Sequence, residues 1–400
     1  MGSKLYLYRV TRDELQNQVA EWANSYSRIM LSWATSVGKS RGFIAIQAAL
    51  GAPKTYLVVS ERPHIENWEI EYRKCGREDL LKNTTIFCYA SLKNFVDTKV
   101  DLLGLDEVHH SSELRISYLK TISSSTIVAM SATTNFGVSY TLRAAFGDFK
   151  ESIIPLSYAI EQGWIQKPQI VLIPLTLDMV EKSEVIEVVR KPVKRVIECD
   201  FQDRLKFLKA PNTKLLIHCT EFEKYKYYDD RVKYFQDLVN LDPSDDKAVF
   251  KLKIAGLERK QYLSSLKTPH VSEFLNSGEL EKKRFICFCG SIKQAESLSK
   301  NVIHSKISHP EKVLKAFKDG ELNELFAVSM LKEGVNIPNI QACVITQLDS
   351  KERDFVQKAG RALRNPDDPT VYIFFFKDTQ DEKYLKVALT NIDDKYIQWI

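Results

Sequence analysis

The run Trp33-Ala34-Thr35-Ser36-Val37-Gly38-Lys39-Ser40 separates an apolar segment, residues 29–31, from a segment with helical periodicity, residues 43–50. This order predicts a strand, a loop and a helix. In that context Gly38-Lys39-Ser40 is typical of a phosphate-binding loop: backbone amides and the helix N-terminus face the phosphates, the lysine pairs with the β and γ oxygens, and the serine hydroxyl faces Mg²⁺. A nucleotide is therefore expected here. The residues expected to contact it are Thr35, Ser36, Val37, Gly38, Lys39 and Ser40.

The loop departs from the usual pattern, which has glycine at the position of Trp33. Taken alone, the three residues Gly38-Lys39-Ser40 also fit an ordinary helix start, at which Gly38 turns the chain and Ser40 caps the first turn. The loop by itself leaves both interpretations open, so other segments must decide between them.

The composition is that of an ordinary globular protein. Hydrophobic residues make up 44% of the 400 residues and charged residues 27%, and this length predicts two or three domains. The net charge of +5 is compatible with a polyanionic partner but does not demonstrate one. No apolar run approaches a membrane span and no signal-peptide core is present, so a cytoplasmic protein is expected. The seven cysteines form no C-x-x-C pair, which argues against a zinc site.

Two further segments carry polar residues in a chemically suggestive order. Residues 102–105 form an apolar strand that leads directly into Asp106 and Glu107. Paired carboxylates at the end of a buried strand suit magnesium chemistry, although a solvated strand terminus is the simpler alternative. Far downstream, Gln357, Arg361 and Arg364 are spaced by three and four residues, so they share one face of a helix.

Together these segments resemble a known family. With Val108-His109 and with Ser131-Ala132-Thr133, they resemble motifs I, II, III and VI of superfamily 2 helicases of the DExH type. The loop in that family lacks the first glycine, which accounts for Trp33, whereas Ser36 stands where most members carry glycine. The nearest subgroup is the restriction-type and repair-type DNA helicases, including phage-encoded ones.

The resemblance implies ATP and Mg²⁺ as cofactors and assigns roles. Asp106 would hold Mg²⁺ through water, together with Ser40, and Glu107 would activate the attacking water. His109, with Ser131 and Thr133, would couple the nucleotide to the nucleic acid. Gln16 would read the adenine edge; Gln18 is the alternative, and Gln16 could instead be a solvated helix residue. The remaining catalytic residues are Lys39, Gln357, Arg361 and Arg364, the two arginines acting as arginine fingers.

Further segments resemble weaker motifs of the same family. The run from Met330 to Pro338 resembles motif V, in which Gly334 and Asn336 would contact the nucleotide. Hydroxyl and guanidinium groups near predicted strand ends would grip the nucleic-acid backbone, as in sequence-independent binding. These nucleic-acid residues are Ser60, Arg62, Ser91, Ser291 and Ser329.

The expected architecture is α/β, with two RecA-like parallel-sheet lobes and an accessory helical insertion. Residues 1–150 would form lobe 1, residues 151–283 the linker and the insertion, and residues 284–400 lobe 2 with a closing helix. From residue 178 to 283 the strand-helix alternation gives way to charged, helical sequence. Basic clusters in this segment, such as Arg190, Lys191, Lys194 and Arg195, could lie along a nucleic-acid backbone or could be a solvated face.

The expected function is an ATP-dependent helicase or translocase acting on nucleic acid, with DNA favoured over RNA. Two alternatives stay open: an ATP-gated nucleic-acid clamp, and a double-strand translocase that remodels without separating strands. A monomer with no membrane association is expected, and the helical insertion is the place for a protein partner. The host cytoplasm is the expected location if the chain is phage-encoded.

Overall fold

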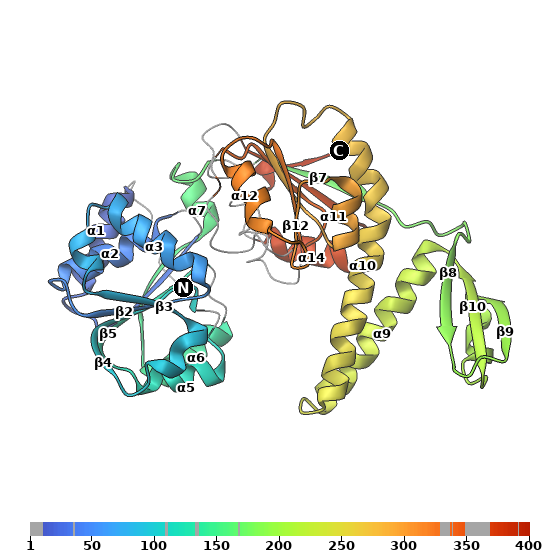
Figure 1. Cartoon of the computed structure of the whole chain (residues 1–400), viewed down its shortest axis with the longest axis horizontal. Coiled ribbons are helices and arrows are strands. Elements are labelled where there is room, and N and C mark those ends of the chain that lie inside the picture. The colour runs from blue at the N-terminus through green and yellow to red at the C-terminus, as the bar shows by residue number, and fades with distance from the viewer. Residues whose placement is uncertain are drawn as a thin grey trace, which may run out of the picture.

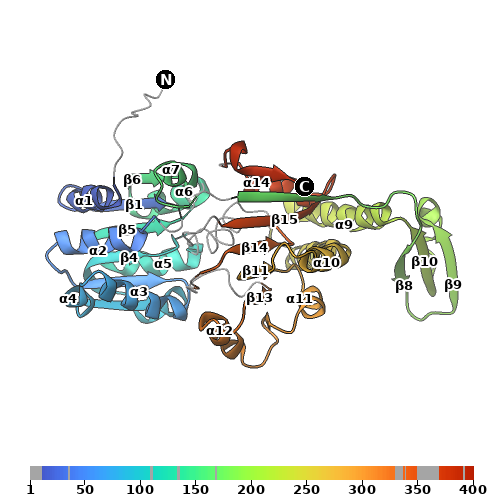
Figure 2. The ribbon, with the colours of Figure 1, turned by 90° about the horizontal axis from the view of Figure 1, so that it is seen from above.

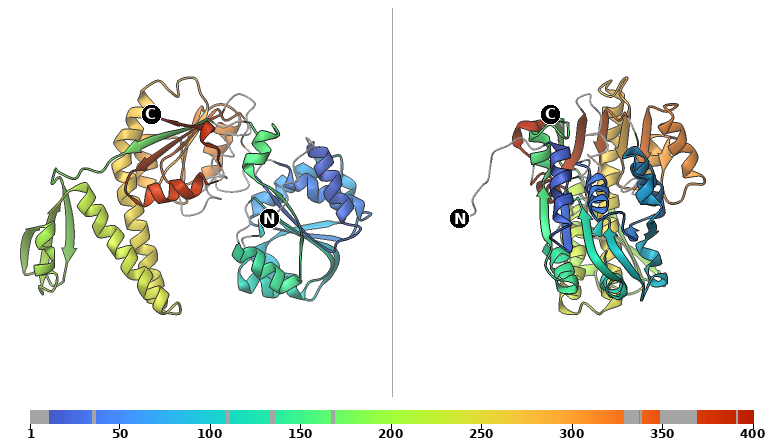
Figure 3. Two further views of the ribbon diagram at one scale, coloured as in Figure 1. Left: turned by 180° about the vertical axis from the view of Figure 1, so that it is seen from behind. Right: turned by 90° about the vertical axis from the view of Figure 1, so that its left-hand side faces the viewer.

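The computed structural model describes residues 11–34, 37–108, 111–132, 136–166, 169–328, 337, 339–348, 369–390 and 392–400. Two parallel sheets, each with helices on its faces, lie side by side (Figures 1 and 2). Two long helices and a small third sheet extend from the second sheet on the side away from the first sheet (Figure 3). The predicted α/β fold with two parallel-sheet lobes is therefore confirmed.

The first sheet has six parallel strands in the order β3-β2-β4-β5-β1-β6. Its central strands are buried on both faces, which is why they read as continuous apolar runs. The strands are β1 Arg28–Trp33, β2 Thr55–Val59, β3 Thr84–Cys88, β4 Lys99–Leu105, β5 Ser123–Ser131 and β6 Lys150–Ile154.

Helices cover both faces of this sheet (Figure 1). On one face Phe43 and Trp68 pack edge to face, their rings 5.5 Å apart; on the other, Leu119 and Leu142 are fully buried. The helices of the first face are α1 Arg12–Trp22, α2 Lys39–Ala49, α3 Arg62–Lys74 and the short α4 Glu78–Leu81, and those of the second are α5 Glu113–Thr121 and α6 Phe136–Phe146. The 3-10 helix η1 Tyr89–Asn94 follows β3, and α7 Leu156–Glu161 leads out of the lobe.

The second sheet has seven parallel strands in the order β12-β13-β11-β14-β15-β7-β16. β7 pairs with β15 along its whole length, so residues 169–175 lie in this sheet although they fall in the range expected to be linker. The strands are β7 Gln169–Leu175, β11 Phe285–Phe288, β12 Val302–Ile303, β13 Glu324–Ala327, β14 Ala342–Ile345, β15 Thr370–Phe376 and β16 Ile397–Trp399. The helices of this lobe are α11 Ile292–Leu298, α12 Pro310–Lys318, α14 Gln380–Ala388 and the 3-10 helix η4 Asp394–Tyr396.

The interposed segment contains two long helices, α9 Glu221–Leu241 and α10 Asp246–Asn276, that pack against each other. It also contains a three-stranded sheet, β8-β10-β9, so the expectation that residues 178–283 lack strands was wrong. Charged residues interrupt the apolar runs of β8 and β9, whose sequences are EVIEVV and RVIECD, and several Val side chains of these strands are exposed. The strands therefore resemble solvated polar sequence. The remaining elements are β8 Glu184–Val189, β9 Arg195–Asp200, η3 Phe201–Asp203, α8 Arg204–Phe207 and β10 Thr213–Cys219.

Candidate nucleotide and nucleic-acid site

The predicted strand, loop and helix are present at the carboxyl end of β1. α2 begins at Lys39, and Gly38 is its N-cap with φ 106°, a left-handed conformation that favours glycine. Gly38 has no side chain to cap this helix start, and the amides of a helix's first turn can bind a ligand. A Cβ at Gly38 would lie 3.2 Å from Nε2 of Gln16. The side-chain amide of Gln16, on α1, therefore lies next to Gly38. Gln18, the alternative, is exposed.

The lysine of the loop is already directed across it. Lys39 Nζ donates a hydrogen bond to the carbonyl of Trp33 at 3.0 Å. This bond closes the loop between the end of β1 and the start of α2. An anion placed at the helix N-terminus would meet both the ammonium and the positive end of the helix dipole.

Trp33 has a structural reason to replace the usual glycine. Its side chain is fully buried, and its Nε1 donates to Ser152 Oγ of β6 at 2.9 Å. The ring fills the space above Gly42 of α2, where a Cβ would come within 2.9 Å of it. Trp33 thus fixes the distance between strand and helix, and Gly42 is the residue that permits it.

The two carboxylates follow β4 at the same edge of the sheet as the loop. The registers pair Leu105 with Ala129 and Met30 with Ala129, so β5 and β1 continue two and three residues beyond the level of Leu105 at the same carboxyl edge. Strands are spaced by about 4.8 Å, which puts the axes of β4 and β1 about 10 Å apart. Ser131 is fully buried between them, at the end of β5. The topology therefore brings loop, carboxylates and Ser131 to one edge.

Each carboxylate is held in a distinct way. Asp106 Oδ2 accepts a hydrogen bond of 2.8 Å from the indole Nε1 of Trp68 on α3. Glu107 has φ 47°, a conformation rare for residues other than glycine, and such strain is often retained at functional positions. Burial raises the pKa of the nearby Tyr89 hydroxyl well above its usual value, and the charges of Asp106 and Glu107 add to the rise. The sequence did not predict this contact between Trp68 and Asp106.

The residues present suit a magnesium ion. Ser40 and Asp106 offer the hard oxygen ligands that Mg²⁺ prefers, and Mg²⁺ is usually bound through one or two carboxylates and substrate phosphates. Within the described ranges no three His, Cys, Asp or Glu side chains cluster in a way that could hold a metal ion.

The predicted nucleic-acid residues of the first lobe lie just past the carboxyl ends of β2 and β3. Ser60 Oγ lies 2.8 Å from Nδ1 of the buried His64, a partner that sequence reasoning missed. Arg62 is exposed at the first residue of α3, and Ser91 is half-buried in η1. In the second lobe Ser291 is the N-cap of α11, and its hydroxyl accepts from the Gln294 amide at 3.1 Å.

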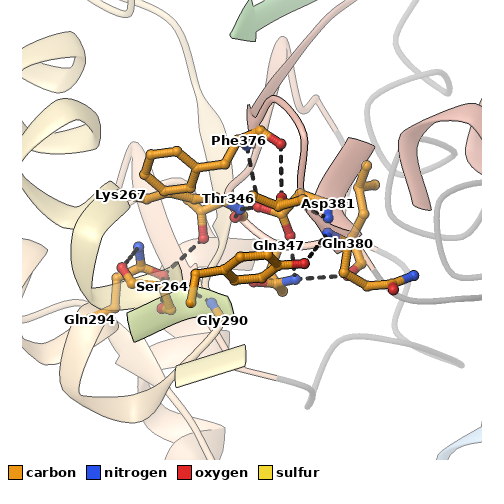
Figure 4. Close-up of polar contacts among 12 residues, drawn as sticks. Ser264, Lys267, Gly290, Gln294, Thr346, Gln347, Phe376, Gln380 and Asp381 are labelled. Atoms are coloured by element: carbon orange, nitrogen blue, oxygen red, sulfur yellow. Dashed lines mark hydrogen bonds and ion pairs between the residues drawn. The ribbon is translucent and has the colours of Figure 1, made fainter. Parts of the chain in front are cut away.

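A buried polar network lies at the carboxyl edge of the second sheet (Figure 4). Lys267 of α10 has no solvent exposure; its Nζ lies 2.5 Å from Asp381 Oδ2 and donates to the carbonyl of Thr346 at 2.7 Å. Asp381 of α14 also accepts from Gln347 at 3.1 Å. The backbone N–H of Gln380 donates a hydrogen bond to the hydroxyl of Tyr225 on α9 at 2.8 Å. The interposed helices are thus bonded to the ends of β14 and β15.

Several predicted site residues lie outside the described residues, so their roles stay predictions. They are Thr35, Ser36, His109, Thr133, Ser329, Gly334, Asn336, Gln357, Arg361 and Arg364.

In the part of the chain that the structure describes, no helix is both long enough and apolar enough to cross a membrane.

Known proteins resemble the chain along most of its length. Residues 267–366 match the helicase conserved C-terminal domain. A match of 23% identity to the DNA 3'-5' translocase XPB2 of Sulfurisphaera tokodaii covers 90% of this chain and 80% of that protein. A match of 34% identity over 92 residues to the ATP-dependent RNA helicase DBP3 of Lodderomyces elongisporus covers 22% of this chain and 17% of that protein.

The fold likeness extends further than the sequence likeness. The Hef helicase domain of Pyrococcus furiosus has a TM-score of 0.53 at 11% identity, and the superposition covers 94% of this chain and 97% of that one. At this identity the likeness shows the shared two-lobe fold alone.

Proposed function

We propose that the chain is a superfamily 2 helicase that uses ATP hydrolysis to move along a DNA strand or to unwind DNA. The observation that carries the proposal is the meeting of Gln16, Gly38 and Lys39 at the edge of the first sheet where Asp106 and Glu107 follow β4. DNA is favoured because the match that spans most of the chain is to a DNA translocase, whereas the RNA-helicase match covers 92 residues. We assign the chain to the restriction-type or repair-type DExH subgroup.

The chemical groups at this edge of the sheet suggest a separate role for each residue. Lys39 exchanges the Trp33 carbonyl for the β and γ phosphates, and the α2 amides bind the phosphate oxygens. Bound Mg²⁺ supplies charge neutralisation of the phosphates. Asp106, oriented by the Trp68 indole, would hold the metal, and Glu107 would take the proton of the attacking water. Arg361 and Arg364 stabilise the charge that develops on the γ-phosphate.

The test of this function is a comparison of ATP turnover with single-stranded DNA, duplex DNA, RNA and no nucleic acid. We expect single-stranded DNA of any sequence to stimulate turnover and the stimulation to weaken with salt, because backbone binding releases counterions. A fork with a single-stranded tail is expected to be unwound only while ATP is hydrolysed. Stronger stimulation by RNA would overturn the DNA assignment.

The same assay separates the proposal from its alternatives. A clamp would bind nucleic acid more tightly with ATP but show neither stimulated turnover nor strand displacement. A double-strand translocase would be stimulated by duplex DNA and would displace a bound protein or a triplex strand without opening a fork. Either outcome would replace the helicase assignment.

The Lys39→Ala variant is expected to lose ATP turnover by about a hundredfold or more, since a charge-assisted contact in a closed site contributes on the order of 3 kcal/mol. Steady-state phosphate release is the measurement. The matched control is Lys82→Ala, which removes an exposed lysine in the turn before β3, away from the loop. Near-normal turnover of Lys39→Ala would remove the phosphate-binding loop from the mechanism.

A further inference from the structure

The two ends of the three-stranded sheet of the interposed segment differ in their charged residues. β10 pairs antiparallel with β8 and parallel with β9, so the start of β8 and the ends of β9 and β10 share one end. That end leads into α9, which begins at Glu221, directly after Cys219 and Thr220. Its carboxylates are Glu184, Asp200 and Asp203.

The opposite end is basic. It is formed by the loop between β8 and β9 and by the loop between α8 and β10, which lie side by side because Lys194 N donates to the Asn212 carbonyl at 2.8 Å and Arg190 N to the Thr213 carbonyl at 2.9 Å. Five exposed cations belong to these loops and their flanks, and we call them the basic rim: Arg190, Lys191, Lys194, Arg195 and Lys209.

The charged residues of the two ends differ in their ion pairing. Toward α9 the carboxylates are paired: Lys182 with Asp200 at 2.8 Å, Lys224 with Glu184 at 2.6 Å, and Lys206 with Asp203 at 2.7 Å. Lys214, beside the rim, is paired with Glu187 at 2.8 Å. Across the described part of the chain none of the five rim cations has an ion pair.

The rim stands apart from both lobes. In Figure 1 β8 runs away from the start of α9, so its far end projects from the body of the molecule. Figures 2 and 3 show the small sheet at the end of the molecule opposite the first lobe. The positive charge is not general to the segment, because the turn between α9 and α10 is acidic, with Asp242, Asp245 and Asp246.

From this arrangement we infer that the basic rim binds the phosphate backbone of a nucleic-acid duplex outside the two lobes. The inference rests on the proposed function, which brings nucleic acid to the chain. A three-stranded edge is about 10 Å wide, and a duplex carries one charge per about 1.7 Å of axis with both strands counted, so about six phosphate charges lie along that length of duplex. The five rim cations, which have no ion pair among the described residues, are available to those phosphates that face the edge.

The absence of a stacking surface favours a duplex over a single strand. Single strands are held by exposed aromatic side chains on which bases stack. In the described small sheet, residues 184–219, the large exposed apolar side chains are Val and Leu, and the aromatic Phe201 is buried under the Arg204 guanidinium, 3.6 Å away. Cations alone suit backbone contacts that carry no sequence information.

The experiment uses the full chain and a fluorescent 40-base-pair duplex without sequence preference. The variant Arg190→Gln/Lys194→Gln/Lys209→Gln removes three rim cations. The matched control, Lys82→Gln/Lys99→Gln/Lys120→Gln, removes three exposed lysines in the first lobe, close to the amino ends of β3, β4 and β5, and changes the net charge equally. Charge-preserving substitution, Arg190→Lys/Lys194→Arg/Lys209→Arg, tests for charge rather than shape.

We expect the rim variant to bind the duplex with an affinity lower by about tenfold or more at low salt. A plot of log affinity against log salt should have a slope smaller in magnitude by about 2 to 3, since each phosphate contact contributes about 0.9. Control and charge-preserving variants should match the parent chain. Basal ATP turnover should be unchanged, which also reports that the rim variant is folded.

Three outcomes would overturn the inference. Equal duplex binding by the rim and control variants would remove the rim from the nucleic-acid path, and ATP turnover stimulated by DNA would then still support the proposed function. A loss seen with single-stranded DNA but not with duplex would reject the assigned occupant. A loss of binding to vesicles of anionic lipid, with duplex binding intact, would assign the rim to a membrane surface instead.

Discussion

The Glu107→Gln variant is expected to bind ATP with Mg²⁺ yet hydrolyse it between about a hundredfold and ten-thousandfold more slowly, because the amide cannot accept the proton of the attacking water. The side chain keeps its size, and the left-handed backbone at this position, φ 47°, is not altered by the substitution. Asp106 and its bond from Trp68 remain in place to hold the metal. A slow enzyme that still binds nucleotide is therefore expected, and nucleic acid should stay bound to it.

Single-turnover phosphate release and equilibrium binding of a fluorescent ATP analogue distinguish the two properties. Glu78→Gln is the matched control, because Glu78 is exposed on the short helix α4, which precedes the amino end of β3. It should behave as the parent chain does. Normal turnover by Glu107→Gln would mean that another group is the base, and loss of nucleotide binding would make Glu107 a binding residue instead.

The Lys267→Met variant is expected to lower the free energy of unfolding by about 3 to 5 kcal/mol, the usual cost of leaving one member of a buried ion pair without its partner. Lys267 has no solvent exposure, and Asp381 has 1%. Burial lowers the pKa of Lys267, and the Asp381 carboxylate opposes this shift and favours the charged lysine. The substitution also leaves the carbonyl of Thr346 without its donor.

Denaturant unfolding, followed by circular dichroism, measures the loss. Lys253→Met, at an exposed position on the same helix, should change stability by less than about 0.5 kcal/mol. Combining Lys267→Met with Asp381→Leu should recover part of the loss, since the uncompensated charge is then removed. A Lys267→Met chain as stable as the parent would show that the buried pair does not hold α10 to the second lobe.

The signals that led from sequence to fold were local ones. The continuous apolar runs of β1, β4 and β5 reflect strands buried on both faces, and their polar ends could be read in order along the chain. The same reasoning failed at β8 and β9, where a sheet with one exposed face carries Glu and Arg between Val and Ile. The pattern there matched solvated sequence as well as strand.

The sequence predicted only those residues of the candidate site that belong to short motifs. Gly38, Lys39, Asp106 and Glu107 stand beside strands whose order makes their meeting at one sheet edge predictable. The contacts that position this edge of the sheet were not predicted: Trp68 of α3 donates to Asp106, and Ser152 of β6 accepts from Trp33. Both partners lie at distances along the chain that no periodicity encodes.

The sequence by itself therefore determined the two α/β lobes and predicted a chemistry for the phosphate loop and carboxylates, because burial periodicity and turn residues act between near neighbours in the chain. The tertiary structure alone decided that β7 completes the second sheet, that Lys267 is buried against Asp381, and that the loop carrying Lys209 lies beside the basic run of residues 190–195. The physical reason is that strand pairing, desolvation of an ion pair and clustering of charge depend on which distant segments meet, and packing of the whole chain settles that.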